Sequence, residues 1–104
     1  MSDTQTRIAE MVGKHKVFLF MKGTPQMPQC GFSHRSAGIL THLGAEFGSF
    51  DVLSDPEVRQ GIKEFANWPT IPQLYVNGDF VGGSDIMMQM FENGELGALL
   101  NKED

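Results

Sequence analysis

The stretch Lys16-Val17-Phe18-Leu19-Phe20-Met21 is almost wholly apolar and is rich in β-branched and aromatic side chains. A short run of this kind, followed by Lys22-Gly23-Thr24-Pro25, is typical of a buried central strand. Further along, apolar residues recur at helical spacing over 33–43 without a proline, which predicts a helix there. Cys30 therefore lies in the loop where a buried strand leads into a helix.

Cys30 is the only cysteine in the 104 residues. The free N–H groups and dipole at the start of a helix stabilise an anion, and the thiolate is the form of cysteine that attacks disulfides or binds metals. Lys22, at the end of the strand, adds a second positive charge nearby. A lone cysteine is by default a small buried apolar residue, but Pro28, Gln29 and Gly31 indicate an exposed loop. We expect a reactive thiol whose reaction partner comes from outside the chain, in a reducing compartment.

Length and composition limit the classes of protein to which the chain can belong. Residues 1–104 are enough for one domain with one core. Asp and Glu outnumber Lys and Arg by 13 to 8, and the net charge of −5 opposes attraction to nucleic-acid phosphates. There is no apolar run of bilayer length, and residues 1–6 lack the features of a secretory signal or a transit peptide. We expect a cytoplasmic protein, or a processed organellar one, that binds neither nucleic acid nor membranes.

The other patterns complete an α/β fold. They predict a helix over 4–13, a strand over 45–52, a helix opened by Ser54-Asp55-Pro56-Glu57, strands over 73–76 and 80–81 around Asn77-Gly78, a helix opened by Ser84 or Asp85, and a short helix after Gly94. This order of elements predicts a four-stranded mixed sheet with helices on both faces.

Four motifs together resemble those of the monothiol glutaredoxins, and they come in that family's order. They are Lys22-Gly23-Thr24-Pro25, Cys30-Gly31-Phe32-Ser33, Trp68-Pro69-Thr70-Ile71-Pro72 and Gly82-Gly83-Ser84-Asp85. The resemblance extends over residues 16–94. It implies a thioredoxin-like fold and a single glutaredoxin domain.

A single thiolate is compatible with two chemistries. It can remove glutathione from a protein by forming its own mixed disulfide, which a second glutathione then reduces. It can also be one ligand of an iron–sulfur cluster, which needs four thiolates and so more than one chain. Two chains supply two, and the resemblance implies a 2Fe-2S cluster bridged by Cys30 of each chain and by two glutathione molecules.

The resemblance also assigns residues to a glutathione site. It implies that Lys22 and Arg59 bind the glycine carboxylate, while Lys63, one turn further, is expected to be an ordinary surface charge. It further implies that Pro72 is cis and that the main chain of Ile71 pairs with the cysteine of glutathione, in the manner of an added strand.

At the far end of this site, Gly83, Ser84 and Asp85 begin a helix whose N–H groups suit the γ-glutamyl carboxylate, with the Asp85 carboxylate on its amine. Ser84 stands where many members of the family carry cysteine. A serine at this position can still cap the helix, but it leaves the chain without a second thiol. Ser33 likewise prevents a Cys-x-x-Cys disulfide. It either caps the helix, which we favour, or donates a weak hydrogen bond to the Cys30 sulfur.

The roles of Phe32 and of the histidines complete the sequence predictions. Phe32 is either a core anchor or a shield beside the cluster. The three histidines share no metal-ligand spacing, and none is expected to bind metal.

We therefore predict a glutathione-dependent carrier that binds a 2Fe-2S cluster as a homodimer and delivers it to apo iron–sulfur proteins, in iron–sulfur protein biogenesis and iron homeostasis. The alternative is an enzyme, a thiol-disulfide oxidoreductase that uses Cys30 to deglutathionylate proteins. By resemblance, the proline-bearing loop before Cys30 favours the carrier. A third interpretation, compatible with the first, is an adaptor that shares the cluster with a BolA-like protein.

Overall fold

The computed structural model describes residues 3–101. The elements, in chain order, are α1 (Asp3–Lys14), β1 (Val17–Met21), α2 (Gly31–His42), β2 (Gly48–Asp51), the 3-10 helix η1 (Val52–Ser54), α3 (Pro56–Phe65), β3 (Gln73–Val76), β4 (Asp79–Gly82), α4 (Ser84–Glu92) and α5 (Glu95–Leu100). The strands form one sheet in the order β2-β1-β3-β4, in which β1 is parallel to β2 and antiparallel to β3. This is the mixed sheet of a thioredoxin-like α/β fold, as predicted.

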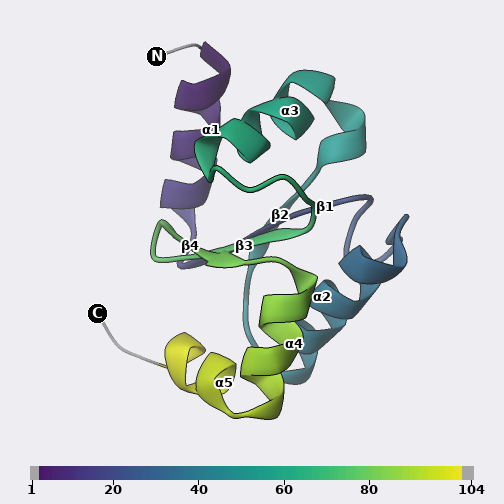
Figure 1. Ribbon diagram of the computed structural model, residues 1–104, viewed down its shortest axis with the longest axis vertical. Helices are drawn as coiled ribbons and strands as arrows, with labels where there is room; N and C mark the ends of the chain where they lie inside the picture. The colour runs from purple at the N-terminus through teal and green to yellow at the C-terminus, as the bar shows by residue number, and fades with distance from the viewer. Residues whose placement is uncertain (1–2, 102–104) are drawn as a thin grey trace.

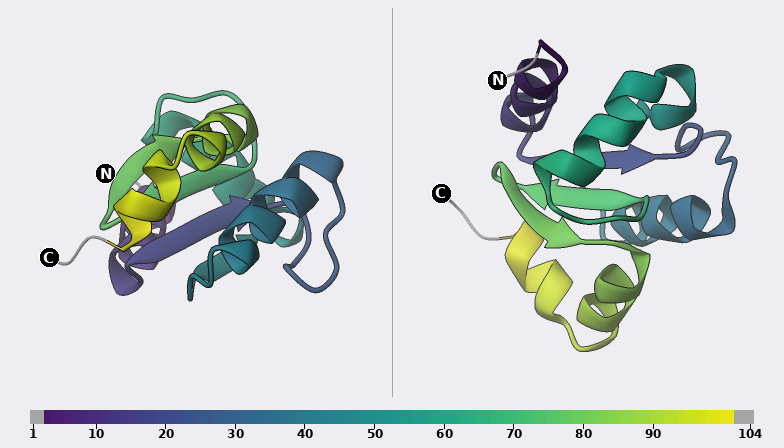
Figure 2. Two further views of the ribbon diagram at one scale, coloured as in Figure 1. Left: turned by 90° about the horizontal axis from the view of Figure 1, so that it is seen from below. Right: turned by 45° about the horizontal axis from the view of Figure 1, so that its top comes forward.

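The central strand β1 is buried along its whole length and supplies side chains to two cores. Phe18 and Phe20 belong to the core under α1 and α3, whereas Val17, Leu19 and Met21 belong to the core under α2, α4 and α5. Helices therefore cover both faces of the sheet, with α1 and α3 on one side and the other three on the opposite side (Figures 1 and 2). The alternation of successive side chains between faces explains why an uninterrupted apolar run was needed here.

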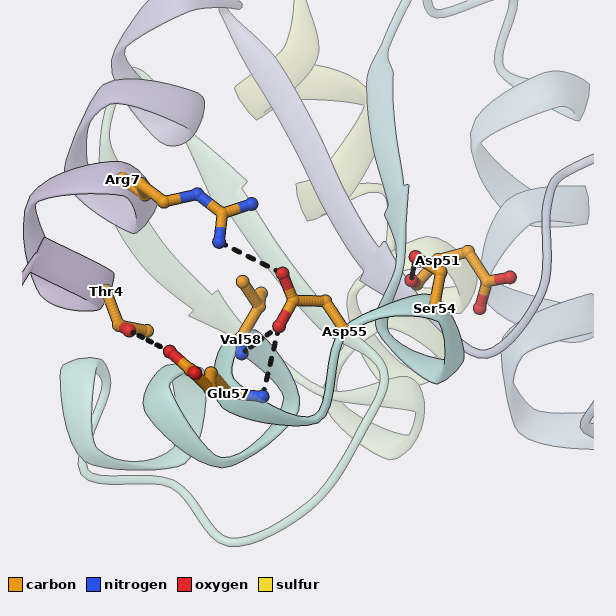
Figure 3. Close-up of polar contacts among 7 residues, drawn as sticks. All are labelled: Thr4, Arg7, Asp51, Ser54, Asp55, Glu57 and Val58. Carbon is orange, nitrogen blue, oxygen red and sulfur yellow. Dashed lines mark hydrogen bonds and ion pairs between the residues drawn. The ribbon is translucent and has the colours of Figure 1, made fainter.

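Polar contacts join α1 to the start of α3 (Figure 3). The Arg7 guanidinium lies 3.0 Å from Asp55 Oδ2, and Asp55 Oδ1 accepts hydrogen bonds from the N–H groups of Glu57 and Val58. Thr4 Oγ1 donates to the Glu57 carboxylate at 3.1 Å. The hydrogen bond from Arg7 is the main reason that the pKa of Asp55 lies below its ordinary value. Asp55 is thus the N-cap of α3, in agreement with the helix start predicted from 54–57.

Two element boundaries differ from the prediction. The predicted strand over 45–52 is paired only over 48–51, because η1 follows at once. There the Leu53 N–H donates to Asp51 Oδ1. The Ser54 hydroxyl donates to the Asp51 carbonyl (Figure 3), and the two hydrogen bonds turn the chain. The helix predicted over 33–43 begins earlier, at Gly31. Among residues 3–101, no helix has the length and apolarity needed to cross a membrane.

Candidate functional site

Cys30 occupies the N-cap position of α2, with an extended backbone (φ −156°, ψ 139°), and is partly exposed. The expectation that Ser33 caps this helix is wrong, because Ser33 lies inside the first turn and is fully buried. The Ser33 hydroxyl oxygen instead accepts a hydrogen bond from the Lys22 N–H at 3.0 Å. Ser33 therefore links the end of β1 to the first turn of α2 and holds Lys22 close to Cys30.

The surroundings of Cys30 favour its thiolate. The main-chain N–H of Ser33 contributes most to holding the pKa of the Cys30 thiol below its ordinary value, and the Phe32 N–H, the Ser33 hydroxyl and the Lys22 charge add to it. Partial burial acts in the opposite direction. Cys30 is the N-cap residue of α2, so its side chain stands at the helix start, where these N–H groups and the helix dipole stabilise a thiolate.

The loop before Cys30 is held by its own hydrogen bonds. The Gln29 N–H donates to the Lys22 carbonyl at 2.9 Å, and Thr24 and Met27 exchange main-chain hydrogen bonds of 3.2 and 3.1 Å. The Thr24 side chain also accepts from the Met27 N–H. This proline-bearing segment is therefore a defined turn that fixes the approach to Cys30.

A groove of about 380 Å³ runs beside Cys30. Its lining residues come from the Cys30 loop, from α2 and α3, from the segment before β3 and from the start of α4: Lys22, Cys30, Phe32, Arg59, Lys63, Pro69, Thr70, Ile71, Pro72, Ser84 and Asp85. Every predicted site residue except Gly83 lies in this lining. A larger hollow of about 620 Å³ lies near Lys14 and Phe47, but no cysteine lines it. The groove is thus the candidate site on chemical grounds.

Gly83 does not line the groove, but it directly precedes Ser84, which does. A side chain there would place a Cβ 3.2 Å from the Pro72 carbonyl oxygen and 3.3 Å from the Trp68 indole nitrogen. Gly83 is also the N-cap residue of α4, so the expectation that Ser84 caps this helix is wrong. Ser84 is the first helical residue, and its hydroxyl is buried without a hydrogen-bond partner among residues 3–101.

Three further features of the groove wall bear on the sequence predictions. The Ile71–Pro72 bond is cis, as expected. Phe32 is 57% exposed, which excludes the core-anchor interpretation. Lys63 lies in the groove lining together with Arg59, so it is more than a surface charge remote from the site. Among residues 3–101, no group of three or more His, Cys, Asp and Glu side chains has the arrangement of a metal site.

The sequence profile of the glutaredoxin family matches residues 17–81. An uncharacterized monothiol glutaredoxin of Synechocystis is 59% identical over 94% of this chain and 92% of that protein. The chain belongs to the monothiol glutaredoxins. Monothiol glutaredoxin-S11 of rice is 56% identical over 86% of the chain, which spans only 18% of that longer protein. A buckwheat glutaredoxin solved as a glutathione complex has a TM-score of 0.83 at 19% identity, covering 93% of this chain and 86% of that one, and thus shares the fold.

The groove of this glutaredoxin also contains residues that the sequence did not single out. The sequence predicts an ordinary surface charge for Lys63, but the structure places it in the groove lining together with Arg59. Thr70 also lines the groove, although within its motif only Ile71 and Pro72 were predicted to take part in the site. One signal was available for Lys63, namely its spacing of one helical turn from Arg59.

The lowered pKa of Cys30 leads to a prediction for alkylation. In this glutaredoxin, the rate of reaction with iodoacetamide should rise with a midpoint below pH ~8.5, the value for an unperturbed cysteine. Ser33→Ala should move the midpoint upward but not restore the unperturbed value, because the N–H groups of Ser33 and Phe32 remain. Lys22→Met should move it less. A midpoint at or above that of free cysteine would contradict this account of the helix start.

Proposed function

We propose that this glutaredoxin binds glutathione in the groove beside Cys30, and that two copies hold a 2Fe-2S cluster which they deliver to apo iron–sulfur proteins, in iron–sulfur protein biogenesis and iron homeostasis. The proposal is carried by one observation, a lone, partly exposed cysteine with a lowered pKa that opens onto a groove with cations and a helix start. We also propose a reducing compartment such as the cytoplasm as its location, and a BolA-like protein as an alternative second subunit.

Glutathione fits the charges along the groove. It is an anionic tripeptide with two carboxylates and one amine, so it needs cations at one end and N–H donors with an acceptor at the other. Lys22 and Arg59 supply cations that suit its glycine carboxylate. The start of α4 and the unpartnered Ser84 hydroxyl suit the γ-glutamyl carboxylate, and the exposed Asp85 carboxylate suits the amine. That a buckwheat glutaredoxin of this fold has been solved as a glutathione complex agrees with this assignment.

The cluster follows from the number of thiolates. This chain contributes one, and its described residues offer no other group that could complete a metal site. A shared cluster would therefore take one Cys30 from each of two chains and one thiolate from each of two bound glutathiones. Because half of these ligands are small exchangeable thiols, the cluster can be released to an acceptor by thiol exchange.

Anaerobic reconstitution tests the proposal. Protein treated with ferrous iron, sulfide and glutathione should develop the visible absorption of a 2Fe-2S cluster and elute as a dimer, while the sample without glutathione should remain a colourless monomer. Transfer is then measured by mixing the coloured dimer with an apo ferredoxin. A colourless product in the presence of glutathione would remove the cluster from the proposal.

Arg59→Ala provides a separate test of glutathione binding. Loss of one charge-assisted contact should weaken glutathione binding about tenfold, measured by calorimetry. Arg35→Ala is the matched control, because Arg35 is exposed on α2 outside the groove lining and its loss changes the net charge equally. Equal affinities of the two variants would show that Arg59 does not contact the ligand.

A second candidate function, deglutathionylation, is favoured by the same lowered pKa. The Cys30 thiolate would attack the glutathione sulfur of a protein–glutathione disulfide, releasing the protein thiolate and forming a Cys30–glutathione disulfide. A second glutathione thiolate would then attack the glutathione sulfur, yielding oxidised glutathione and regenerating the Cys30 thiolate. A turnover assay on a glutathionylated protein distinguishes the two functions, since a carrier is expected to be nearly inactive in it.

A further inference from the structure

Gln73 is a fully buried polar residue that the proposed chemistry leaves unused. It is the first residue of β3 and directly follows Pro72, yet its exposed fraction is 0%. Its side-chain Nε2 donates hydrogen bonds to the carbonyl oxygens of Trp68 at 3.1 Å and Thr70 at 3.2 Å. Both N–H bonds of the amide are thereby used. Burying an amide costs desolvation free energy unless its polar atoms form hydrogen bonds. An amide that is fully buried and has both N–H bonds paired therefore indicates a specific structural role.

Tyr75 fixes the orientation of this amide. The Tyr75 hydroxyl donates a hydrogen bond to Gln73 Oε1 at 3.0 Å, so the oxygen must face Tyr75 and the nitrogen must face the two carbonyls. Burial raises the pKa of Tyr75 well above its ordinary value, which keeps the hydroxyl a donor. The Tyr75 ring is itself held by aromatic neighbours, with ring centroids 5.7 Å from Phe20 and 5.5 Å from Phe80.

The two carbonyls belong to the segment that forms one wall of the groove. Between α3 and β3 the chain runs back over the sheet without helix or strand from Trp68 to Pro72 (Figure 1). Four of its residues, 69–72, line the groove. A segment without regular structure depends on side chains for the hydrogen bonds of its carbonyls. Gln73 supplies two of them, on either side of Pro69.

We propose that Gln73 is a positioning residue for ligand binding: its amide, oriented by Tyr75, fixes the 68–72 segment so that the main chain of Ile71 is presented to glutathione in the correct place. The inference rests on the proposed function, because it names the residue that determines how well the groove is preorganised for that ligand. Gln73 does not line the groove and acts only through the carbonyls of Trp68 and Thr70.

Gln73→Met tests the proposal, because methionine fills a similar volume and has no N–H donor. We expect glutathione binding to weaken about tenfold. In the variant the segment 68–72 is less ordered before binding, and part of the binding free energy is then used to order it. Without ligand, the backbone ¹⁵N order parameters of Thr70 and Ile71 should fall in Gln73→Met, while those of β1 stay unchanged. Tyr75→Phe, which retains the ring and loses only the orienting hydroxyl, should weaken binding about threefold. Its effect decides the matter if Gln73→Met does not fold.

Val12→Ala is the control for a purely structural effect. Val12 belongs to α1, is buried in the core between that helix and the sheet, and does not line the groove, so this variant should lose stability while binding glutathione like the wild type. If the wild type itself does not bind glutathione, the proposed function fails, and the order parameters still report on the role of Gln73. If the wild type binds and both Gln73→Met and Tyr75→Phe bind equally well with unchanged order parameters at Thr70 and Ile71, the positioning role is refuted alone.

Discussion

The Cys30→Ser variant is expected to remain folded and to bind glutathione, yet to form no coloured dimer. A serine hydroxyl stays protonated at neutral pH, so the stabilisation that the start of α2 gives to a thiolate has no anion to act on. Deglutathionylation should fall by at least about a thousandfold for the same reason, because no second cysteine stands in for the lost nucleophile. The measurements are visible absorption after anaerobic reconstitution and turnover on a glutathionylated protein.

The controls for this variant come from the same sample. Because Cys30 is partly exposed and its side chain makes no capping hydrogen bond, the exchange of sulfur for oxygen should change the thermal midpoint by only a few degrees. The glutathione affinity should also stay within about threefold, since the groove cations and the start of α4 are unchanged. Cluster absorption equal to that of the wild type would mean that the iron is bound elsewhere, and the proposed cluster site would then be wrong.

Much of the fold was predictable because its patterns are local. The apolar run over 16–21 has one outcome, a strand covered on both faces, and Asn77-Gly78 between two apolar segments leads to the hairpin of β3 and β4. The prediction failed where a side chain forms a hydrogen bond with a backbone group distant in the sequence. Ser33 was expected to cap the helix because serine favours helix starts, but its hydroxyl oxygen accepts a hydrogen bond from the Lys22 N–H instead.

Most residues of the candidate site were predictable, either from motifs of recognisable chemistry or, as for Arg59, from the family resemblance. Cys30 and Ile71-Pro72 come from motifs with a recognisable chemistry, and the structure brings both into one groove. Gln73 follows a proline and precedes apolar residues, so its sequence context indicates an ordinary strand residue. Its role depends on the fold of the segment over 68–72 back onto β3, and no local pattern encodes such a return path.

Gly23→Ala is expected to be the most destabilising single-methyl change in the loop before Cys30. Gly23 is buried with φ +88°, and an added Cβ would overlap the Met27 carbonyl oxygen and lie 2.7 Å from the Gln29 nitrogen. Both obstacles are backbone atoms, which cannot move aside without opening the turn. The left-handed conformation costs about 1 kcal/mol, and with the overlap we expect a loss of at least about 3 kcal/mol in the free energy of unfolding. Urea denaturation measures this loss.

Gly44→Ala separates the two contributions to that loss. Gly44 has a similar φ of +73°, but nothing lies within 4 Å of an added Cβ, so only the conformational cost of about 1 kcal/mol is expected. The Gly23 variant should also bind glutathione more weakly, because its N–H donates to Asp51 Oδ1 at 2.9 Å and a displaced loop moves the adjacent Lys22 away from the groove. If the two alanine variants lose the same stability and bind glutathione equally well, the loop before Cys30 accommodates the added methyl group without cost. Its hydrogen-bonded turn then does not fix the position of Cys30.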